Sequence, residues 1–200
     1  MKHIRRRSLL ACAVLAGTTA GMAPAHAQDS WPTQPVRLIV PYAAGGFADT
    51  RARKIADALG RSLGQPVVIE NKGGAGGVTG TDVIAKATDG HTFGFGSPGP
   101  LVTNPMLMKK LPYDARKAFK PIILIERAPL FLTTAPNQDF KSVEDLVEFA
   151  RANPGRLSYG SSGVGGAHHL SGELLAFQTK TEMTHVAYKG GAPAPAGLMG

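Results

Sequence analysis

Cysteine is almost missing from this chain of 200 residues, in which Cys12 is the only one. Once the first 27 residues are set aside, what remains has no disulfide, no cysteine nucleophile and no thiolate metal site. No later apolar run is long enough to span a membrane. The fold must therefore be held by its core. A chain of this length buries roughly 70% of its unfolded surface, enough for one domain or two small ones.

Charged residues are also few, at 18% of the chain, and the formal net charge is +8. Residues 1–27 carry four of the 22 basic side chains and no acidic one, so the rest of the chain has a net charge of +4. That excess is too mild and too dispersed to indicate nucleic acid as a partner. It favours an anionic ligand by a modest long-range effect.

The first 27 residues have the three-part pattern of a secretory signal peptide. A basic head, MKHIRRR, precedes a short apolar segment, and the stretch ends in Ala25-His26-Ala27. We expect cleavage after Ala27 and a mature chain that begins at Gln28. Arg6-Arg7 weakly favours the twin-arginine route. An ordinary basic head is the simpler explanation, and both routes stay open.

Strand-like and helix-like patterns alternate through the rest of the chain, which predicts an α/β fold with parallel sheets. Ser142 and Asp145 are spaced as a capping box, and Asp49 or Thr50 is expected to cap an earlier helix that Gly64 ends. Two further apolar runs lie within 120–136. The expected strands are 36–42, 66–70, 91–97, 156–162 and 183–191, and the expected helices lie within 48–64, 81–87, 103–111, 142–155 and 163–180.

Glycine recurs after each predicted strand, in AAGGFAD, KGGAGG, GSPG, GSSGVGG and YKGG. In parallel sheets, ligands bind beyond the carboxyl ends of the strands. Glycine lets backbone N–H groups approach a ligand closely, and the helices that follow add the positive ends of their dipoles. The recurrence therefore predicts a small anion as the ligand.

Two stretches have features of a cofactor-binding or catalytic motif. GFGSPG (residues 94–99) matches the G-x-G-x-x-G pattern of a dinucleotide-binding site. It does not lie in the first strand–helix turn of a βαβ unit, however, and no acidic residue follows at the required distance. An activated Ser161 or Ser162 with His169 or His185 as base would make a secreted hydrolase of a small ester or amide. That alternative stays open.

Two further groups have the residue types of a metal site and of a general base. His169 and Glu173 share one helix face beside His168, but no third and fourth ligand follows at a readable spacing. A histidine that donates a hydrogen bond at a helix start is the simpler interpretation. Asp49 is equally well explained as a helix cap. We therefore predict no metal and no cofactor.

The stretch from Trp31 to Ser97, with its VRLIVPYAAGGFADTRARKIADALG segment, resembles the start of the Bug family. These are the periplasmic substrate-binding proteins of tripartite tricarboxylate transporters. NPMLMKKLPYD, LSYGSSGVGGAHHLSGELL and THVAYKGGAPA are similar to later family signatures and come in the family's order. The resemblance covers Trp31 to Gly200.

The resemblance implies a type-two periplasmic binding fold of two α/β lobes with a ligand cleft. Residues 28–128 would form the first lobe and 129–200 the second, incomplete one, because family members continue well past Gly200. The chain would thus be a truncated member or a non-functional fragment. The implied partners are the membrane components of the transporter and a sensor kinase, and the implied location is the periplasm.

The resemblance also implies a ligand held with bound waters against the first glycine loop. The ligand would be a dicarboxylate or tricarboxylate, an acidic amino acid or an aromatic carboxylate. On this view Gly45 and Gly46 leave room for the ligand, and Asp49 caps the helix, orders the loop, or both. The implied binding residues are Ala44, Gly45, Gly46, Phe47, Asp49, Ser97, Ser161, Ser162, His169, Tyr188, Lys189 and Gly190.

Overall fold

A computed structural model describes residues 31–199 of the chain. The predicted signal peptide and its cleavage site lie outside the described residues. The described residues from Gln34 onward form one compact unit that contains both sheets, so the predicted lobe boundary at residue 128 stays a prediction. Among the described residues, no helix is both long and apolar enough to cross a bilayer.

The first sheet has three parallel strands in the order β2-β1-β3. They are β1 (Val36–Val40), β2 (Val67–Asn71) and β3 (Thr92–Gly94). The central strand β1 is the most apolar, and Val36, Ile39 and Val40 are fully buried. A continuous apolar run is typical of a parallel strand that is covered on both faces.

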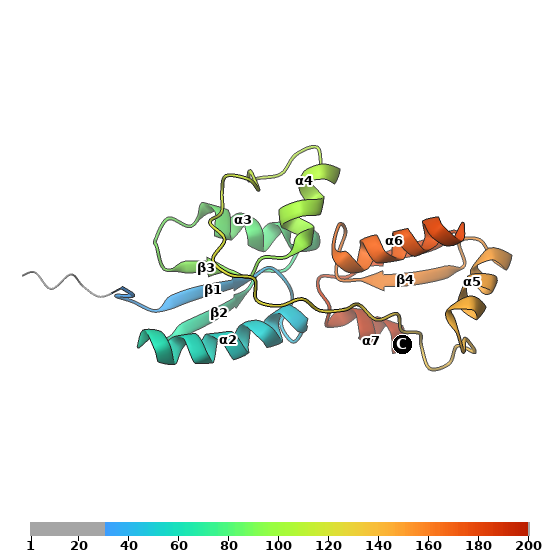
Figure 1. Cartoon of the computed structure of the whole chain (residues 1–200), viewed down its shortest axis with the longest axis horizontal. Coiled ribbons are helices and arrows are strands. Elements are labelled where there is room, and N and C mark those ends of the chain that lie inside the picture. Colours follow the sequence, from blue (N-terminus) through green and yellow to red (C-terminus); the bar gives the residue numbers. More distant parts are fainter. Residues whose placement is uncertain (1–30, 200) are drawn as a thin grey trace, which may run out of the picture. The chain divides into compact units, whose positions relative to one another are not determined.

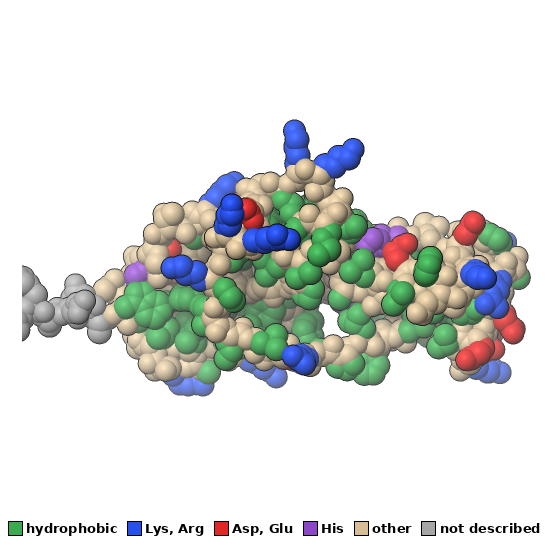
Figure 2. Space-filling model, turned by 45° about the horizontal axis from the view of Figure 1, so that its top comes forward, with side chains coloured by type: hydrophobic (Ala, Val, Ile, Leu, Met, Phe, Trp, Pro, Cys, Tyr) green, Lys and Arg blue, Asp and Glu red, His purple; other side chains and the backbone are tan. Residues whose placement is uncertain are grey.

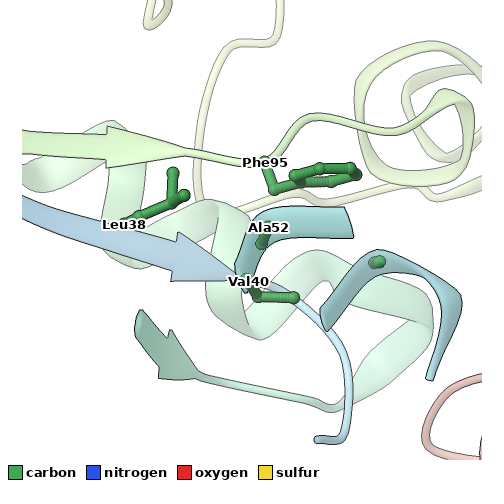
Figure 3. Packing of buried hydrophobic residues seen from close by; sticks show 5 residues of the cluster. Leu38, Val40, Ala52 and Phe95 are labelled. Atoms are coloured by element: carbon green, nitrogen blue, oxygen red, sulfur yellow. The ribbon is translucent and has the colours of Figure 1, made fainter. Parts of the chain in front are cut away.

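Helices cover both faces of this sheet (Figure 1), with α2 (Phe47–Leu63) on one and α3 (Val78–Lys86) on the other. Ala52 and Ala56 of α2 are buried, and these small side chains let the helix pack closely against the sheet. Figure 3 shows Leu38 and Val40 of β1 packed with Ala52 and Phe95. The predicted end of this helix at Gly64 is confirmed, and Gly64 takes the left-handed conformation.

The second sheet has two parallel strands, β4 (Leu157–Ser161) and β5 (Met183–Ala187). Helix α6 (Ala167–Thr179) packs against both strands, and α7 (Pro193–Met199) packs against β4. Helix α5 (Val143–Ala152) precedes β4 and begins with the predicted capping box. Ser142 Oγ accepts from Asp145 N at 3.1 Å, and Asp145 Oδ2 accepts from Ser142 N at 3.1 Å.

The remaining helical segments are short; one precedes α3, and the other two lie between β3 and a long extended segment. They are η1 (Ala75–Gly77), the π-helical turn η2 (Gly99–Thr103) and α4 (Asn104–Leu107). Residues 120–135 then run without helix or strand. The apolar runs predicted there are extended and largely exposed. Their most exposed large side chains are Ile122, Ile123, Leu124, Phe131 and Leu132.

Candidate functional site

The first glycine loop lies directly against the segment that follows β5. Ala43 N donates a hydrogen bond to Lys189 O at 3.2 Å. A Cβ on Gly190 would lie 3.0 Å from Ala43 N, and one on Gly46 would lie 3.3 Å from Ala192 N. The space above Gly46 is therefore filled by the backbone of residues 191–192. Glycine at position 46 allows two backbone segments to approach each other.

The other glycine loops meet in the same way. A Cβ on Gly76 would collide with Val164 O, and one on Gly163 would lie 2.7 Å from Gly76 Cα. A Cβ on Gly99 would lie 3.3 Å from Gly166 Cα. The glycine-rich segments that follow β1, β2 and β3 thus contact those that follow β4 and β5. The predicted gathering of glycine loops at the carboxyl ends of the strands is present in the structure.

Asp49 orders the first loop, and its predicted role as a helix N-cap is wrong. The N-cap of α2 is Gly46, without a side-chain hydrogen bond, and Thr50 lies within the helix. Asp49 is in the first turn and reaches back, so that Oδ2 accepts from Gly45 N at 2.9 Å. The helix begins earlier than expected because the loop closes onto this buried carboxylate.

Two further side chains hold the Asp49 carboxylate. Arg53 Nε donates to Oδ2 at 2.9 Å, and Asn71 Nδ2 donates to Oδ1 at 3.0 Å. Asp49 is only 3% exposed. The hydrogen bond from Arg53, helped by those from Gly45 and Asn71, lowers the pKa of Asp49 to about 2 against the opposing effect of burial. The carboxylate is therefore ionised and fully engaged, which suits a structural role better than that of a general base.

Tyr42 joins three of the loops, although it is not among the predicted binding residues. Its hydroxyl lies 2.5 Å from Ser97 Oγ, and its carbonyl accepts from Asn71 Nδ2 at 3.2 Å. A Cβ on Gly77 would lie 3.2 Å from the Tyr42 hydroxyl. Burial raises the pKa of Tyr42, so the phenol stays neutral and can donate. The only available signal was its place at the carboxyl end of a strand.

The loop between β4 and α6 is held by the side chains that the family resemblance assigned to the site. Ser161 Oγ accepts from Gly163 N at 3.1 Å, and His169 Nδ1 accepts from Gly165 N at 3.1 Å. Ser162 Oγ lies 2.9 Å from His168 Nδ1. Since Nδ1 of His169 accepts a hydrogen bond, the proton of the neutral ring is on Nε2. The Nε2–H group, whose nitrogen lies 3.9 Å from Glu173 Oε1, is therefore the donor that His169 offers to a ligand.

Ser161 also lies 2.7 Å from His185 Nε2, a distance that fits a nucleophile and its base. Two observations weigh against a hydrolase. Ser161 is 1% exposed, and its Oγ is already bonded to the backbone of Gly163. Burial and the neighbouring His169 ring, 4.1 Å away between centroids, lower the pKa of His185.

Tyr188 is the predicted site residue that the structure places elsewhere. Its ring packs over Gly160, where a Cβ would lie 3.3 Å from Tyr188 Cε2, and against Gly197 of α7. Only its backbone joins the loop region, where its N–H donates to Ser161 O at 2.9 Å. The side chain therefore fixes α7 against β4.

Phe47, the first residue of α2, is half exposed beside the first loop. The Arg51 guanidinium lies 4.8 Å from its ring centroid. Arg51 Nε is in turn 3.0 Å from Glu126 Oε2 in the extended segment. Phe47 is thus an apolar side chain that is held in place by a charged neighbour.

The described part of the chain shows no metal site. No group of three or more His, Cys, Asp or Glu side chains within it is placed to hold a metal ion.

Two open cavities lie away from the loops. One, of about 670 Å³, runs along the C-terminal half of α6, and the other, of about 560 Å³, lies between the end of α2 and β2. On the face seen in Figure 2, basic side chains are scattered and form no single patch.

Comparison with known families decides what kind of protein this is. Residues 51–200 match the model of the tripartite tricarboxylate transporter family receptor. The chain belongs to this family. Its similarity to BugT of Bordetella pertussis, 38% identical over 184 residues, confirms the Bug resemblance. The family is one of receptors, not enzymes, so the hydrolase alternative is set aside.

Solved structures confirm the fold of a periplasmic binding protein. The structure of Rpa4515 from R. palustris with adipate has a TM-score of 0.81 and 41% identity to this chain. That of MatC from Rhodopseudomonas palustris with bound malate has a TM-score of 0.79 and 32% identity.

The similarity extends over most of this chain but only part of each relative. The match covers 91% of this chain and 56% of BugT. For Rpa4515 and MatC it covers 84% of this chain and 56% and 57% of the solved chains. The chain thus spans little more than half the length of these relatives.

Proposed function

We propose that this protein captures a small carboxylate in the periplasm and delivers it to a tripartite tricarboxylate transporter. The observation that carries the proposal is the meeting of five glycine-rich loops from two parallel sheets. The chain's membership of a receptor family supports it. Two similar structures contain carboxylate ligands, bound malate in MatC and adipate in Rpa4515.

The donors for such a ligand come from three of the loops. Ser97 and Ser162 supply hydroxyls, His169 supplies Nε2–H, and Lys189 supplies an exposed ammonium group. A carboxylate accepts several hydrogen bonds, and a charged donor makes each of them stronger. Gly46 and Gly190 let the first loop and the segment after β5 approach each other closely. Asp49 contributes indirectly by holding the Gly45 amide in place.

The partners follow from the same proposal. The receptor would pass its ligand to the membrane components of the transporter, and a sensor kinase remains a prediction from the family resemblance alone. Delivery from the periplasm requires export, which the signal-peptide pattern of residues 1–27 supports.

A thermal-shift screen of the purified full-length protein tests the proposal. Malate, citrate, adipate, glutamate and benzoate are the probes, and uncharged amides of matching shape are the controls. A ligand at a hundredfold excess over its dissociation constant stabilises the native state by about 2.7 kcal/mol, which gives a visible shift in the melting temperature. We expect a shift with one or more carboxylates and none with the amides. Equal shifts with amides and acids, or none at all, would count against a carboxylate receptor.

A further inference from the structure

Positive charge is scarce in the five loops. Residues 41–46, 72–77, 95–100, 162–166 and 188–192 contain only two charged side chains, Lys72 and Lys189. Lys72 is 3.6 Å from Glu70, which is also bonded to Arg37. Among the ion pairs of the described residues, none includes Lys189. The loops therefore offer one cation that is not already neutralised by a carboxylate.

Nearby arginines and histidines add no further unpaired positive charge to the loops. Arg51 is paired with Glu126, and Arg53 with Asp49. His169 Nδ1 accepts a hydrogen bond from Gly165 N at 3.1 Å. His185 lies against the His169 ring, and burial together with that ring lowers the pKa of His185. A trianion would bring three charges to a site with one available cation, and charges withdrawn from water need partners.

Apolar surface is present at the same loops. The Phe47 ring is 51% exposed directly after Gly46, and the Val164 side chain is 53% exposed on the loop that touches Gly76. The Arg51–Glu126 pair holds a guanidinium against the Phe47 ring. Because the ring is already fixed, it loses little side-chain freedom when a ligand packs against it.

We propose that this site selects carboxylates with one or two acidic groups on an extended apolar body, and that Phe47 is a residue that determines this specificity. The inference rests on the proposed function and names its substrate class. One carboxylate is held by Lys189, the hydroxyls and the loop backbone. The hydrocarbon or aromatic part of the ligand lies against Phe47. A compact, highly charged acid gains nothing from the ring.

Calorimetric titration of the full-length protein with acids of graded shape tests this. The probes are malate and citrate as compact acids, and adipate, octanedioate and benzoate as acids with an apolar body. We expect adipate, octanedioate or benzoate to bind at least tenfold more tightly than citrate. An apolar contact of one or two carbon atoms is worth about tenfold in affinity.

Substitution of Phe47 distinguishes a loss of ligand specificity from a general loss of binding. Phe47→Ala is expected to weaken binding of the acid with the best apolar fit about tenfold while changing malate binding less than threefold. Phe47→Leu keeps an apolar side chain and should retain most of the affinity. Phe177→Ala removes another exposed aromatic ring, on α6 and away from the loops, and should leave every affinity unchanged.

The outcomes distinguish the two proposals. If citrate binds most tightly, or if Phe47→Ala and Phe47→Leu weaken all acids equally, the specificity inference is overturned and the receptor function stands. If none of the acids binds to the folded wild-type protein, both are overturned. If Phe47→Ala lowers the affinity only for the acids with an apolar body, the inference is supported.

Discussion

Single residues at the loops act mainly by holding backbone in place. Asp49 is the clearest case, because its two oxygens accept from Gly45, Arg53 and Asn71. The sequence showed that an acid stood at a strand–helix junction. It could not show that Asn71, 22 residues away, would share the carboxylate. That partner depends on the pairing of β1 with β2 and so on tertiary structure.

Asp49→Asn is expected to destabilise the protein by on the order of 2 kcal/mol at pH 7, because the pKa falls from 3.8 to about 2 on folding. A carboxyl with a lowered pKa stabilises the native state above its unfolded pKa, and this contribution is lost as the pH falls through about 2. Urea denaturation of both proteins from pH 7 down to pH 2 measures the difference. We expect it to shrink below pH 4. A difference that stays constant with pH would show that the charge is not responsible.

Helices and strands were largely predictable from the sequence. The apolar run of β1, the small-residue face of α2 and the Ser142–Asp145 capping box are local patterns, and each is in the structure. The exact start of α2 was not predictable, because Gly46 rather than a side-chain cap begins it. The apolar residues of 120–135 form no strand. A strand needs a partner as well as a suitable sequence, and the described residues provide none there.

Ser142→Ala tests the capping box at the start of α5. The substitution leaves Asp145 N without its acceptor and is expected to cost about 1 kcal/mol of stability. Urea denaturation measures the change. Ser171→Ala, at an exposed position inside α6, is the control and should be neutral or slightly stabilising. Equal effects at the two positions would mean that the cap contributes nothing.

Gly76→Ala tests the contact between the loops after β2 and β4. The new methyl group would collide with Val164 O, so the two loops must separate. Gly90 has nearly the same backbone angle, with φ of 67° against 63°, but has nothing within 4 Å of the added Cβ. Both changes carry the left-handed strain of about 1 kcal/mol. Gly76→Ala is expected to lower stability by at least about 1 kcal/mol more than Gly90→Ala, because overpacking adds to the strain.

If both glycine variants melt at the same temperature, the loop contact is not tight in solution. If Gly76→Ala loses more stability than Gly90→Ala and also binds carboxylates more weakly, the contact between these loops supports the ligand site. Intact binding by Gly90→Ala serves as the control for this comparison.

At the scale of the whole molecule, the site joins loops from two separate sheets. The sequence predicted that the glycine-rich segments would gather at the carboxyl ends of the strands, since parallel sheets place their ligands there. Which loop faces which was not predictable. The pairings of Gly76 with Val164 and of Ala43 with Lys189 span about 90 and 150 positions of the chain. Contacts of that sequence separation depend on the complete topology.

Hydrogen exchange with and without a bound carboxylate tests most directly whether the five loops form the ligand site. The full-length protein is labelled in the presence of the acid that gives the largest thermal shift, and exchange is followed by mass spectrometry. We predict slower exchange in peptides that cover residues 41–46, 72–77, 95–100, 162–166 and 188–192. Exchange along the cavity lined by Glu173 and Phe177 should not change. Protection confined to that cavity, with the glycine loops unaffected, would contradict this account of the site.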